Sequence, residues 1–472
     1  MPSTGSHARE PHGLDLQSYL GHQRWFAGKG RAWQVTGTTT VAELRSPGGP
    51  APGVRIDVAS VTYDDGETET YQLPLAIYPD PAAHLVHAFV GEEVDESGRM
   101  WFVYDALHDK DSTGLWVEGI ETERHDGGFA FHREPTATEL PPGGPSIVVG
   151  AEQSNTSMIF GDSLILKVFR KVSSGLNPDI EMHSALAAAG STHIAAPLGW
   201  LEGSWRDPAG NEVTASLAMA QSYLKEATEG WELALTSVRD LYAEADLHAD
   251  EVGGDFAGES TRLGAATAEV HAALAQALPT GRMEKKELTA LAEGMRSRLE
   301  RTAAEVPDLA PYVHALRSAY DDLVDLEDPV HVQRVHGDFH LGQVMRTFEG
   351  WKLLDFEGEP ARPLAERRAL ESPLKDVAGM LRSFDYAARH LLADHPADAQ
   401  RAYRATEWAD RNRNAFLTGY ARAGGRDPRE QPVLLRAFET DKAVYEVLYE
   451  ARNRPTWLQI PMAAIHRLAA EE

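Results

Sequence analysis

The sequence predicts an α+β protein in which a β-rich N-terminal lobe precedes a mostly helical C-terminal lobe. Runs of β-branched and aromatic residues of strand length dominate roughly the first 220 residues. From about residue 258, apolar residues recur at spacings of three and four, which is typical of amphipathic helices. Strands followed by helices indicate two lobes of different construction, and active sites commonly lie in the cleft of such a pair.

The first predicted strands lie between residues 33 and 80, in "WQVTGTTTVAEL", "VRIDVASVTY" and "ETYQLPLAIY". Further strands are expected in "RMWFVYDAL", "SIVVGAEQSNTSMIFGDSLILKVFR" and "ASLAMAQSYL". The basic segment "HQRWFAGKGR" precedes them all, and its Trp25 and Phe26 should pack this first part of the chain onto the body of the protein.

Helical periodicity first appears strongly in "DIEMHSALAAA". It is clearest in "ESTRLGAATAEVHAALAQAL" and in "LLRAFETDKAVYEVLYEAR". Between the long helices, only residues 329–356 are expected to form strand or loop.

The composition excludes several functional classes. The chain has 472 residues, no cysteine and a net charge of −27, from 72 acidic and 45 basic side chains. The acidic excess argues against nucleic acid or an anionic membrane as a partner, because both would be repelled. Without cysteine there are no disulfides, thiolate nucleophiles or cysteine-ligated metal centres. We find no signal-peptide-like run and no apolar stretch of about 20 residues, and therefore expect a cytoplasmic protein.

Two acidic segments carry the strongest chemical signal. "VHGDFHLGQ" and "LLDFEGE" place Asp338, Gln343 and Asp355 among apolar residues. In phosphoryl transfer from ATP, a carboxylate orients the attacking hydroxyl and hard oxygen ligands hold Mg²⁺. An Asp followed five residues later by an amide puts a base and a metal ligand in one loop, and Asp355 after a strand supplies a second ligand. Either Asp alone is more often a turn former. The combination favours the catalytic interpretation.

A lysine upstream of these segments is a candidate for phosphate binding. Lys167 stands at the end of the strand run "LILKVF", and Glu181 follows fourteen residues later in a predicted helix. A strand lysine held by a helix glutamate can bind the phosphates of ATP as a point charge. The alternative is that both side chains are ordinary solvated residues.

Two flanking segments complete the predicted nucleotide site. "GAEQSNTSMIFGD" is a turn of small and hydroxyl residues whose backbone N–H groups would cover phosphates, although a plain polar hairpin has the same composition. "AMAQSYLKEATEGWELAL" predicts a connection between the lobes that offers backbone groups to an adenine edge. The candidate residues of the two segments are Ser154, Thr156, Ser157, Gln221, Tyr223 and Leu224.

The last long helix carries a candidate sugar site. In "FETDKAVYEVLYEARNRPTW", Asp441, Tyr445 and Tyr449 fall along one stripe, with Lys442 and Glu446 beside them. Carboxylate, ammonium and aromatic groups suit a polyhydroxylated sugar, which needs hydrogen bonds and a flat apolar face. A tyrosine stripe that packs in the core is the alternative.

These segments also carry a family resemblance. "VHGDFHLGQ" with "LLDFEGE" resembles the catalytic loop and metal-binding segment of the aminoglycoside phosphotransferase and choline kinase group, which has a protein-kinase-like fold. "QRWFAGKGR", "WKLLDFEGEP", "RRALESPLKDVAGMLRSFDYAA", "DRNRNAFLTGY" and "DKAVYEVLYEARNRPTWLQIP" look like actinobacterial maltokinases. The matching segments run from about residue 20 to residue 465.

The resemblance implies a bilobal fold and an activity. The fold would comprise an N-terminal cap subdomain (1–90), an intermediate β-rich subdomain (91–222) and a helical C-terminal lobe (223–472). The activity would be ATP- and Mg²⁺-dependent phosphorylation of maltose at its anomeric hydroxyl. The product, maltose 1-phosphate, feeds α-glucan (glycogen) synthesis, and in some organisms the kinase associates with trehalose synthase.

The resemblance also assigns roles to individual residues. Asp338 would be the catalytic base, and Gln343 and Asp355 the metal ligands. Lys167 would contact phosphates and pair with Glu181. The remaining assignments are His336, which would support the catalytic loop, and Tyr386, Lys442 and Tyr445, which would lie near the sugar.

Some positions depart from related kinases, and alternatives stay open. The loop amide is Gln343 where many such kinases have Asn, and Phe356 is followed by Glu357 where protein kinases have Gly. The roles of Glu357 and Glu359 are left open. A kinase for glucosamine or another aminosugar is the second interpretation. A catalytically inactive scaffold is the third, and the complete set of Lys167, Asp338, Gln343 and Asp355 argues against it.

Overall fold

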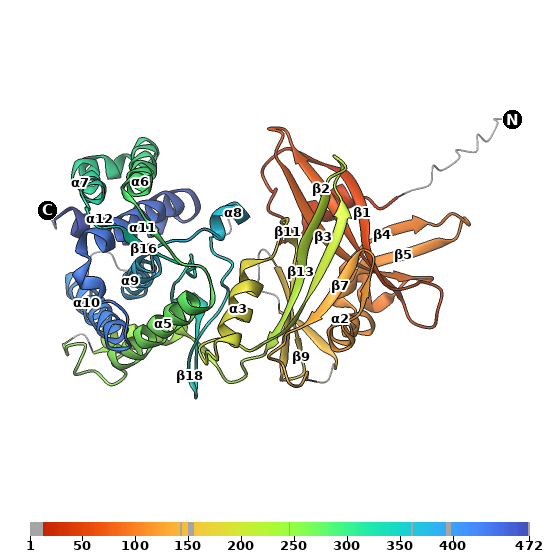
Figure 1. Ribbon diagram of the computed structural model, residues 1–472, viewed down its shortest axis with the longest axis horizontal. Coiled ribbons are helices and arrows are strands. Elements are labelled where there is room, and N and C mark those ends of the chain that lie inside the picture. Colours follow the sequence, from red (N-terminus) through yellow and green to blue (C-terminus); the bar gives the residue numbers. More distant parts are fainter. Residues whose placement is uncertain are drawn as a thin grey trace. The chain divides into compact units, whose positions relative to one another are not determined.

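The computed structural model describes residues 13–141, 144–149, 155–244, 246–359, 362–392 and 398–470. The candidate residue Ser154 lies outside the described residues. The chain divides into two compact units, the first made of Met1–Glu181 and Ala196–Lys225, the second of Met182–Ala195 and Glu226–Glu472. Figure 1 shows that the long strands belong to the first unit and most of the helices to the second. The predicted α+β class and the order of the two parts are confirmed.

The first unit begins with an antiparallel sheet whose strands follow the order β1–β2–β3–β5–β4, with a short strand β11 on β3. The core of this sheet packs against the first helix, α1 (Leu16–His22), and Trp25 and Phe26 are buried in it, as predicted. The strands are β1 (Trp33–Arg45), β2 (Gly53–Tyr63), β3 (Thr68–Tyr78), β4 (Phe89–Val94), β5 (Met100–Asp105) and β11 (Lys171–Val172).

A second antiparallel sheet completes the first unit, in the order β6–β7–β12–β13–β10–β9–β8. Helix α2 (Lys110–Thr122) packs its fully buried Trp116 into the core of this sheet. Helix α3 (Pro178–Ala188) follows β11 and leads into the second unit. The strands are β6 (His125–Asp126), β7 (Phe129–Arg133), β8 (Ser146–Val149), β9 (Asn155–Phe160), β10 (Leu164–Phe169), β12 (Pro197–Arg206) and β13 (Glu212–Ser222).

The two subdomain boundaries predicted from the sequence can be compared with the strands of this unit. The boundary at residue 90 lies within β4, and the first sheet continues to Asp105 at the end of β5. The boundary at residues 222 and 223 lies close to Glu226, where the chain enters the second unit for good.

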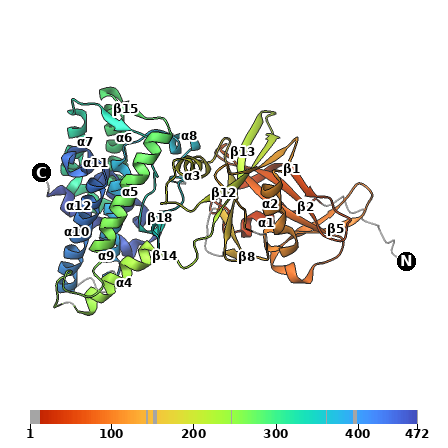
Figure 2. The same ribbon diagram turned by 60° about the horizontal axis from the view of Figure 1, so that its bottom comes forward.

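The second unit is built mainly from helices around one apolar core. The long helices α5 and α10 pack closely, and Gly264 of α5 permits this approach. Any side chain at that position would collide with the carbonyl oxygen of Phe416 on α10. Figure 2 shows α5 and α10 side by side from another direction. The helices are α4 (Gly230–Ala243), α5 (Ala257–Ala277), α6 (Lys285–Glu305), α7 (Val313–Val324), α8 (Leu364–Arg367), α9 (Leu374–His390), α10 (Ala399–Arg422), α11 (Pro432–Asn453) and α12 (Gln459–Ala469).

Small strands interrupt the helices and carry the acidic segments. β14 (Thr228–Glu229), β17 (Val344–Thr347) and β18 (Gly350–Leu353) form one small sheet. β15 (Gly281–Met283) pairs with β16 (Val330–Val332). The strand and loop region expected at 329–356 is therefore confirmed, whereas β15 was not expected.

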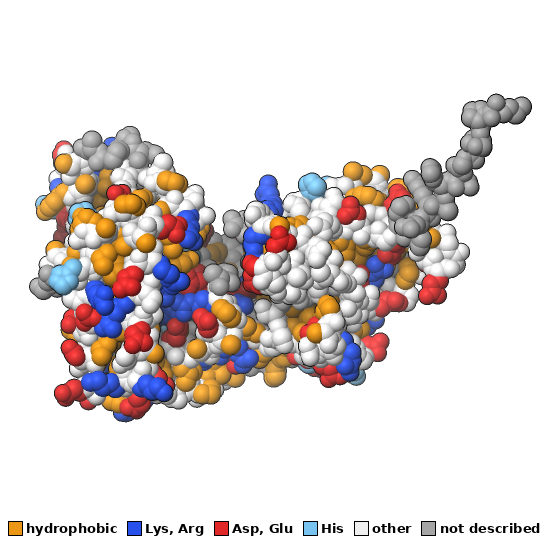
Figure 3. Space-filling model, turned by 90° about the horizontal axis from the view of Figure 1, so that it is seen from above, with side chains coloured by type: hydrophobic (Ala, Val, Ile, Leu, Met, Phe, Trp, Pro, Cys, Tyr) orange, Lys and Arg blue, Asp and Glu red, His pale blue; other side chains and the backbone are white. Residues whose placement is uncertain are grey.

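On the face shown in Figure 3, acidic and basic side chains are interspersed, so the negative charge is not gathered there. Within the described residues, no helix combines the length and apolar character needed to cross a bilayer.

Candidate active site

The loop that carries Asp338 is clamped through its backbone. It follows β16, turns at Gly337 with a φ of +84°, and ends in a short 3-10 helix, Leu341–Gln343. The carboxylate of Asp376 on α9 accepts hydrogen bonds from the backbone N–H groups of His336 (2.7 Å) and Gly337 (2.9 Å). Two backbone donors on one buried carboxylate fix the loop immediately before Asp338.

Asp376 is itself anchored from the far side. The Nε2 atom of His271 on α5 lies 3.0 Å from its Oδ2 atom, and the Nδ1 atom of that histidine lies 3.0 Å from the hydroxyl of Tyr420. Burial of Asp376 raises the pKa of its carboxyl, but His271 and the other donors outweigh burial, so the net pKa lies below the ordinary value. Asp376 is therefore ionised at neutral pH and accepts from all its neighbours.

Asp338 faces a lysine from a distant part of the chain. The Nζ atom of Lys442 on α11 lies 3.1 Å from Oδ1 of Asp338, and their side chains are 29% and 24% exposed. Burial raises the pKa of the Asp338 carboxyl, but Lys442 and, to a smaller degree, His340 outweigh it and lower the net pKa. Burial lowers the pKa of Lys442, yet Asp338 and Glu446 raise it above its ordinary value. The pair is thus an ionised carboxylate beside an ionised ammonium.

The predicted metal ligands lie side by side. The Nε2 atom of Gln343 donates to Oδ2 of Asp355 at 3.2 Å. Asp355 follows β18 in a left-handed conformation, with a φ of +62°, which is rare for a residue other than glycine and costs conformational energy. The buried His336 ring contacts the carbonyl of Leu354 at 2.7 Å through Nε2, which ties the loop to this turn. This placement fits a supporting role for His336.

Helix α9 lets the loop approach through a glycine. A Cβ atom at Gly379 would stand 2.6 Å from the carbonyl oxygen of Phe339, closer than real contacts allow. Further along the loop, the backbone N–H of Leu341 donates a hydrogen bond to the hydroxyl oxygen of Ser383 on the same helix at 3.0 Å. Residues from one helix therefore contact both halves of the loop.

A cavity of about 660 Å³ lies within the second unit, and Asp338 is part of its wall. Its walls are rich in aromatic rings, and the rings of Tyr445 and Tyr449 stack with their centroids 6.3 Å apart. Burial and the neighbouring Glu359 raise the pKa of Tyr445 to about 12, so its hydroxyl stays protonated. The lining residues are Glu229, Trp231, Asp338, His340, Gly342, Glu359, Gly379, Ser383, Tyr386, His390, Lys442, Tyr445, Glu446, Tyr449, Glu450, Arg454 and Trp457.

The sugar candidates from the sequence line two cavities that share residues. Tyr386, Lys442 and Tyr445 line the large cavity. Lys442 and Tyr445 also line a smaller one of about 100 Å³, together with Asp338 and Asp441. Asp441 does not line the large cavity, and its Oδ1 atom lies 3.0 Å from Nε of Arg298 on α6.

The nucleotide candidates lie in the first unit, along neighbouring strands. Lys167 on β10 pairs in register with Ser157 on β9 and with Met219 on β13. Its ammonium group lies 3.4 Å from the carboxylate of Asp179 on α3. Asp179 is two residues before the predicted partner Glu181 and was not singled out from the sequence.

Of the other nucleotide candidates among the described residues, two are buried on β9 and the rest lie near or after the end of β13. The hydroxyl of Thr156 accepts a hydrogen bond from Nε of the buried Arg170 at 2.8 Å, so it is directed into the unit. Ser157 is also buried. Gln221 is near the end of β13, and the backbone N–H of Tyr223 donates to the carbonyl oxygen of Ser163 at 2.9 Å. Leu224 follows Tyr223 in the connection to the second unit.

Several residues of the site were not singled out from the sequence. Asp376 is preceded by "SPLK" and followed by "VAGML", so its signal is a single acidic residue on an apolar helix face. Such a residue is seldom buried without a partner, and this rule could have identified it. The cavity residues Trp231, His390, Glu450, Arg454 and Trp457 carry no comparable signal, because they come from three separate segments.

Replacing Lys442 is expected to move the acid limb of the pH–rate profile. If Asp338 is the catalytic base, its carboxylate must be ionised to accept a proton, and activity should fall as the pH drops through its pKa. Without the ammonium, that pKa rises toward the value that burial favours, and the acid limb of kcat in Lys442→Met shifts to higher pH. Lys442→Arg keeps the charge and should keep the limb in place. An unshifted limb in Lys442→Met would refute the assignment of Asp338 as the titrating base.

Comparisons with known proteins place the chain in a family. Residues 19–109 match the model of the maltokinase N-terminal cap domain, and residues 148–430, more than half of the chain, match the phosphotransferase enzyme family. A glucosamine kinase of Streptacidiphilus jiangxiensis is 30% identical over 333 residues, which cover 68% of this chain and 72% of the relative. A glucosamine kinase of Mycolicibacterium smegmatis is 29% identical over 339 residues, covering 68% and 79%.

Solved structures agree on the fold. A glucosamine kinase in complex with glucosamine, ADP and inorganic phosphate matches with a TM-score of 0.69 and 23% identity, over 96% of this chain and 99% of that one. A second crystal form of glucosamine kinase matches with a TM-score of 0.70 and 22% identity, over 97% and 100%. The chain belongs to the phosphotransferase enzyme family, in the branch that carries the maltokinase N-terminal cap domain.

Proposed function

We propose that this protein is an ATP-dependent sugar kinase that phosphorylates the anomeric hydroxyl of maltose. The observation that carries the proposal is Asp338, paired with Lys442 at 3.1 Å, in the wall of an aromatic cavity large enough for a sugar. Aromatic faces with carboxylate, ammonium and hydroxyl groups between them are what a polyhydroxylated ring requires. The matched family accounts for the use of ATP, and a relative in the same fold was solved with ADP and a sugar.

The chemistry expected of Asp338 is that of a base that orients its substrate. Its carboxylate accepts a hydrogen bond from the acceptor hydroxyl and aligns that oxygen for in-line attack on the terminal phosphorus of ATP. The new O–P bond forms as the bond to the ADP oxygen breaks, and the hydroxyl proton passes to Asp338. Lys442 keeps Asp338 ionised beforehand, and its ammonium is also close enough to offset negative charge on the transferred group.

The adjacent amide and carboxylate of Gln343 and Asp355 fit a divalent metal ion. Amide and carboxylate oxygens are hard ligands of the kind that Mg²⁺ prefers, and the 3.2 Å contact places the two groups within reach of one ion once the amide oxygen turns inward. Bound Mg²⁺ would neutralise phosphate charge during transfer. Leu354 and His336 hold the turn that presents Asp355.

The charges around the cavity favour a neutral acceptor. Four of its carboxylates already have a cation partner from the protein. These pairs are Asp338 with Lys442, Glu359 with Arg362, Glu446 with Arg382, and Glu450 with Arg454. Carboxylates neutralised in this way can still accept hydrogen bonds from hydroxyls, but they attract an ammonium group only weakly.

A second candidate acceptor is glucosamine. The observation that supports it is one carboxylate in the cavity wall that could pair with the ammonium group of this sugar. Glu229, at the start of α4, is the cavity carboxylate without a cation partner in the described part of the chain. Burial, with a smaller contribution from Glu232, raises the pKa of its carboxyl. A ligand ammonium would supply the missing partner. The curated relatives at 29–30% identity are glucosamine kinases.

An acceptor assay with Glu229→Gln tests the proposal. We expect the wild type with ATP and Mg²⁺ to phosphorylate maltose and not glucosamine, and Glu229→Gln to keep the maltose KM within about threefold, since an amide also hydrogen bonds to hydroxyls. Product formation is followed by coupled ADP release and by mass spectrometry of the sugar phosphate.

The opposite pattern would identify the aminosugar kinase. Turnover of glucosamine alone, with a glucosamine KM raised about tenfold or more in Glu229→Gln, would replace maltose by glucosamine. ATP binding with transfer to neither sugar would favour the scaffold interpretation.

The finer consequences of a maltokinase activity belong to the same proposal. They are a cytoplasmic location, supply of maltose 1-phosphate to α-glucan (glycogen) synthesis, and association with trehalose synthase. These consequences depend on the relationship to maltokinases, and the match of residues 19–109 to the maltokinase N-terminal cap domain supports that relationship.

A further inference from the structure

A buried arginine holds one oxygen of a cavity carboxylate. Glu446 on α11 lines the large cavity, and Arg382 on α9 donates to its Oε2 atom twice, from Nε at 2.9 Å and from Nη2 at 2.7 Å. The Arg382 side chain is 0% exposed and that of Glu446 is 10% exposed. Because both donors converge on Oε2, the other oxygen, Oε1, has no protein donor among the described residues and is available to a ligand.

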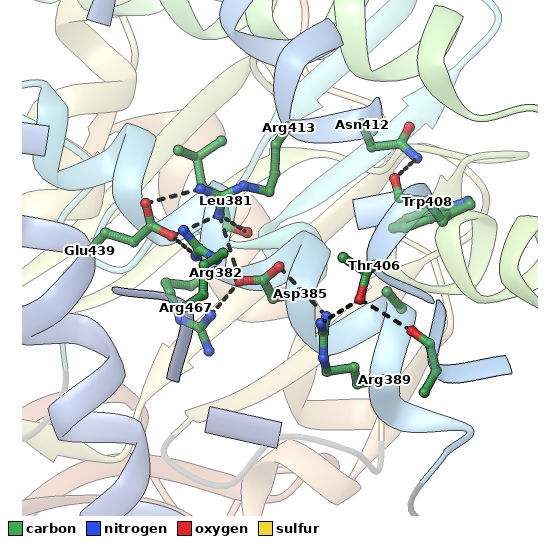
Figure 4. Close-up of polar contacts among 12 residues, drawn as sticks. Leu381, Arg382, Asp385, Arg389, Thr406, Trp408, Asn412, Arg413, Glu439 and Arg467 are labelled. Atoms are coloured by element: carbon green, nitrogen blue, oxygen red, sulfur yellow. Dashed lines mark hydrogen bonds and ion pairs between the residues drawn. The ribbon is translucent and has the colours of Figure 1, made fainter. Parts of the chain in front are cut away.

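Arg382 is fixed in turn by a network of ion pairs below the cavity. Its Nη1 atom donates to Asp385, whose carboxylate also lies 3.3 Å from Arg467 and 3.6 Å from Arg413. Figure 4 shows Arg382, Asp385, Arg413 and Arg467 directed toward one another, with Glu439 beside them. The three guanidinium groups share the carboxylate of Asp385, so Arg382 has little freedom to turn.

The same arginine lies close to a second wall residue. Its guanidinium carbon stands 5.9 Å from the ring centroid of Tyr386, whose hydroxyl donates to Oε1 of Glu450 at 3.1 Å. Tyr386 and Glu450 both line the cavity. One buried cation is thus placed behind adjacent parts of the cavity wall.

The charge on Glu446 depends on this contact. Burial raises the pKa of the Glu446 carboxyl, and Arg382 is the largest influence that opposes the rise. A carboxylate in such surroundings tends to take up a proton when its cation is removed or displaced.

We propose that Arg382 is a positioning residue for the acceptor, which aims Oε1 of Glu446 into the cavity to receive a sugar hydroxyl. The inference rests on the proposed sugar kinase function, and it adds a residue that does not itself touch the substrate. Its effect is on acceptor binding, because in the described part of the chain Asp338 pairs with Lys442 and has no hydrogen bond or ion pair to Arg382 or Glu446.

Arg382→Lys tests this role while keeping the charge. A lysine cannot place two N–H groups on one oxygen in the fixed geometry of a guanidinium. We expect the acceptor KM to rise about tenfold, as small displacements of a positioning group commonly do, with kcat and the KM for ATP nearly unchanged. An unchanged acceptor KM would overturn the inference.

The matched control is Arg413→Lys. Arg413 belongs to the same buried network and binds Glu439 through two N–H groups, at 2.8 and 3.0 Å, but it does not line the cavity. Both variants should lose thermal stability, and only Arg382→Lys should raise the acceptor KM. An equal rise in Arg413→Lys would mean that the effect is merely structural.

A double-mutant cycle identifies the residue through which Arg382 acts. In a Glu446→Gln background, Arg382→Lys should raise the acceptor KM no further. A full additional increase would show that Glu446 is not the mediator and would overturn the inference.

The design separates this inference from the proposed function. The assays use whichever sugar the wild type phosphorylates, so turnover of glucosamine alone would refute maltose and still test Arg382. Sugar binding is measured in parallel from the fluorescence of the cavity residues Trp231 and Trp457. A wild type that neither phosphorylates nor binds either sugar would overturn both.

Discussion

Asp338→Asn is expected to lower kcat by about 10³-fold, within the range attributed to general-base catalysis. The amide keeps the size and hydrogen-bonding reach of the carboxylate but cannot take the proton of the attacking hydroxyl. It also loses the charge that Lys442 neutralises at 3.1 Å. Binding of ATP should change little, because Asp338 serves the acceptor in this mechanism. Steady-state kinetics and calorimetric titration with nucleotide measure the two effects separately.

A surface aspartate gives the control for this substitution. Asp328 is exposed shortly before β16, and Asp328→Asn removes the same charge without touching the loop. Its activity should equal that of the wild type. If Asp338→Asn retained substantial turnover, Asp338 would not be the base, and the proposed mechanism would fail.

Asp376→Asn is expected to lower both stability and activity, because one carboxylate serves three partners. Asparagine keeps a single acceptor oxygen, so its NH₂ group would face the backbone N–H of His336 or Gly337 or the ring of His271. Breaking a buried, hydrogen-bonded ionic group costs roughly 3 kcal/mol of unfolding free energy. The loosened loop should also lower kcat by about tenfold or more. Urea denaturation and steady-state kinetics provide the measurements.

The pH dependence supplies a check on this second prediction. The folded pKa of Asp376 is lowered, so its contribution to stability is present above the unfolded pKa and is lost as the pH falls through the folded value. Asp376→Asn should lack that part of the acid destabilisation. As a control, Asp255→Asn breaks an ion pair with Arg411 near the surface and should cost less than about 1 kcal/mol. Equal losses in the two variants would show that Asp376 has no special role.

Two elements that the sequence did not predict, strand β12 and helix α2, share a physical cause. Strand β12 has Gly199 and Gly203 within it, and glycine disfavours strand. In the structure a Cβ atom at Gly199 would stand 2.4 Å from the carbonyl oxygen of His132, so neighbouring strands require glycine there. Helix α2 contains two glycines, and burial of Trp116 offsets its poor helix propensity. In both cases packing overrides local preference.

The candidate residues that the sequence identified lie close together in the chain, whereas those it missed act through contacts between distant parts of the chain. Asp338, Gln343 and Asp355 lie within eighteen residues, so their spacing alone brought them together as candidates. Asp376 acts through a contact with backbone 39 and 40 residues away, and Arg382 through a contact 64 residues away. The periodicity of apolar residues reflects local secondary structure and cannot predict contacts between residues so far apart in the sequence.

By itself, the sequence determined the order of a β-rich and a helical part, the acidic loop and turn, and the aromatic face of the last long helix. These follow from local spacing, because strands, helices and short loops repeat on the scale of a few residues. Only the tertiary structure decided that Lys442 meets Asp338, that Asp441 turns toward Arg298, and that Asp376 and Arg382 lie beneath the site. Those outcomes depend on how α9 and α11 pack against each other. That packing is set by the burial of apolar side chains contributed by the whole second unit.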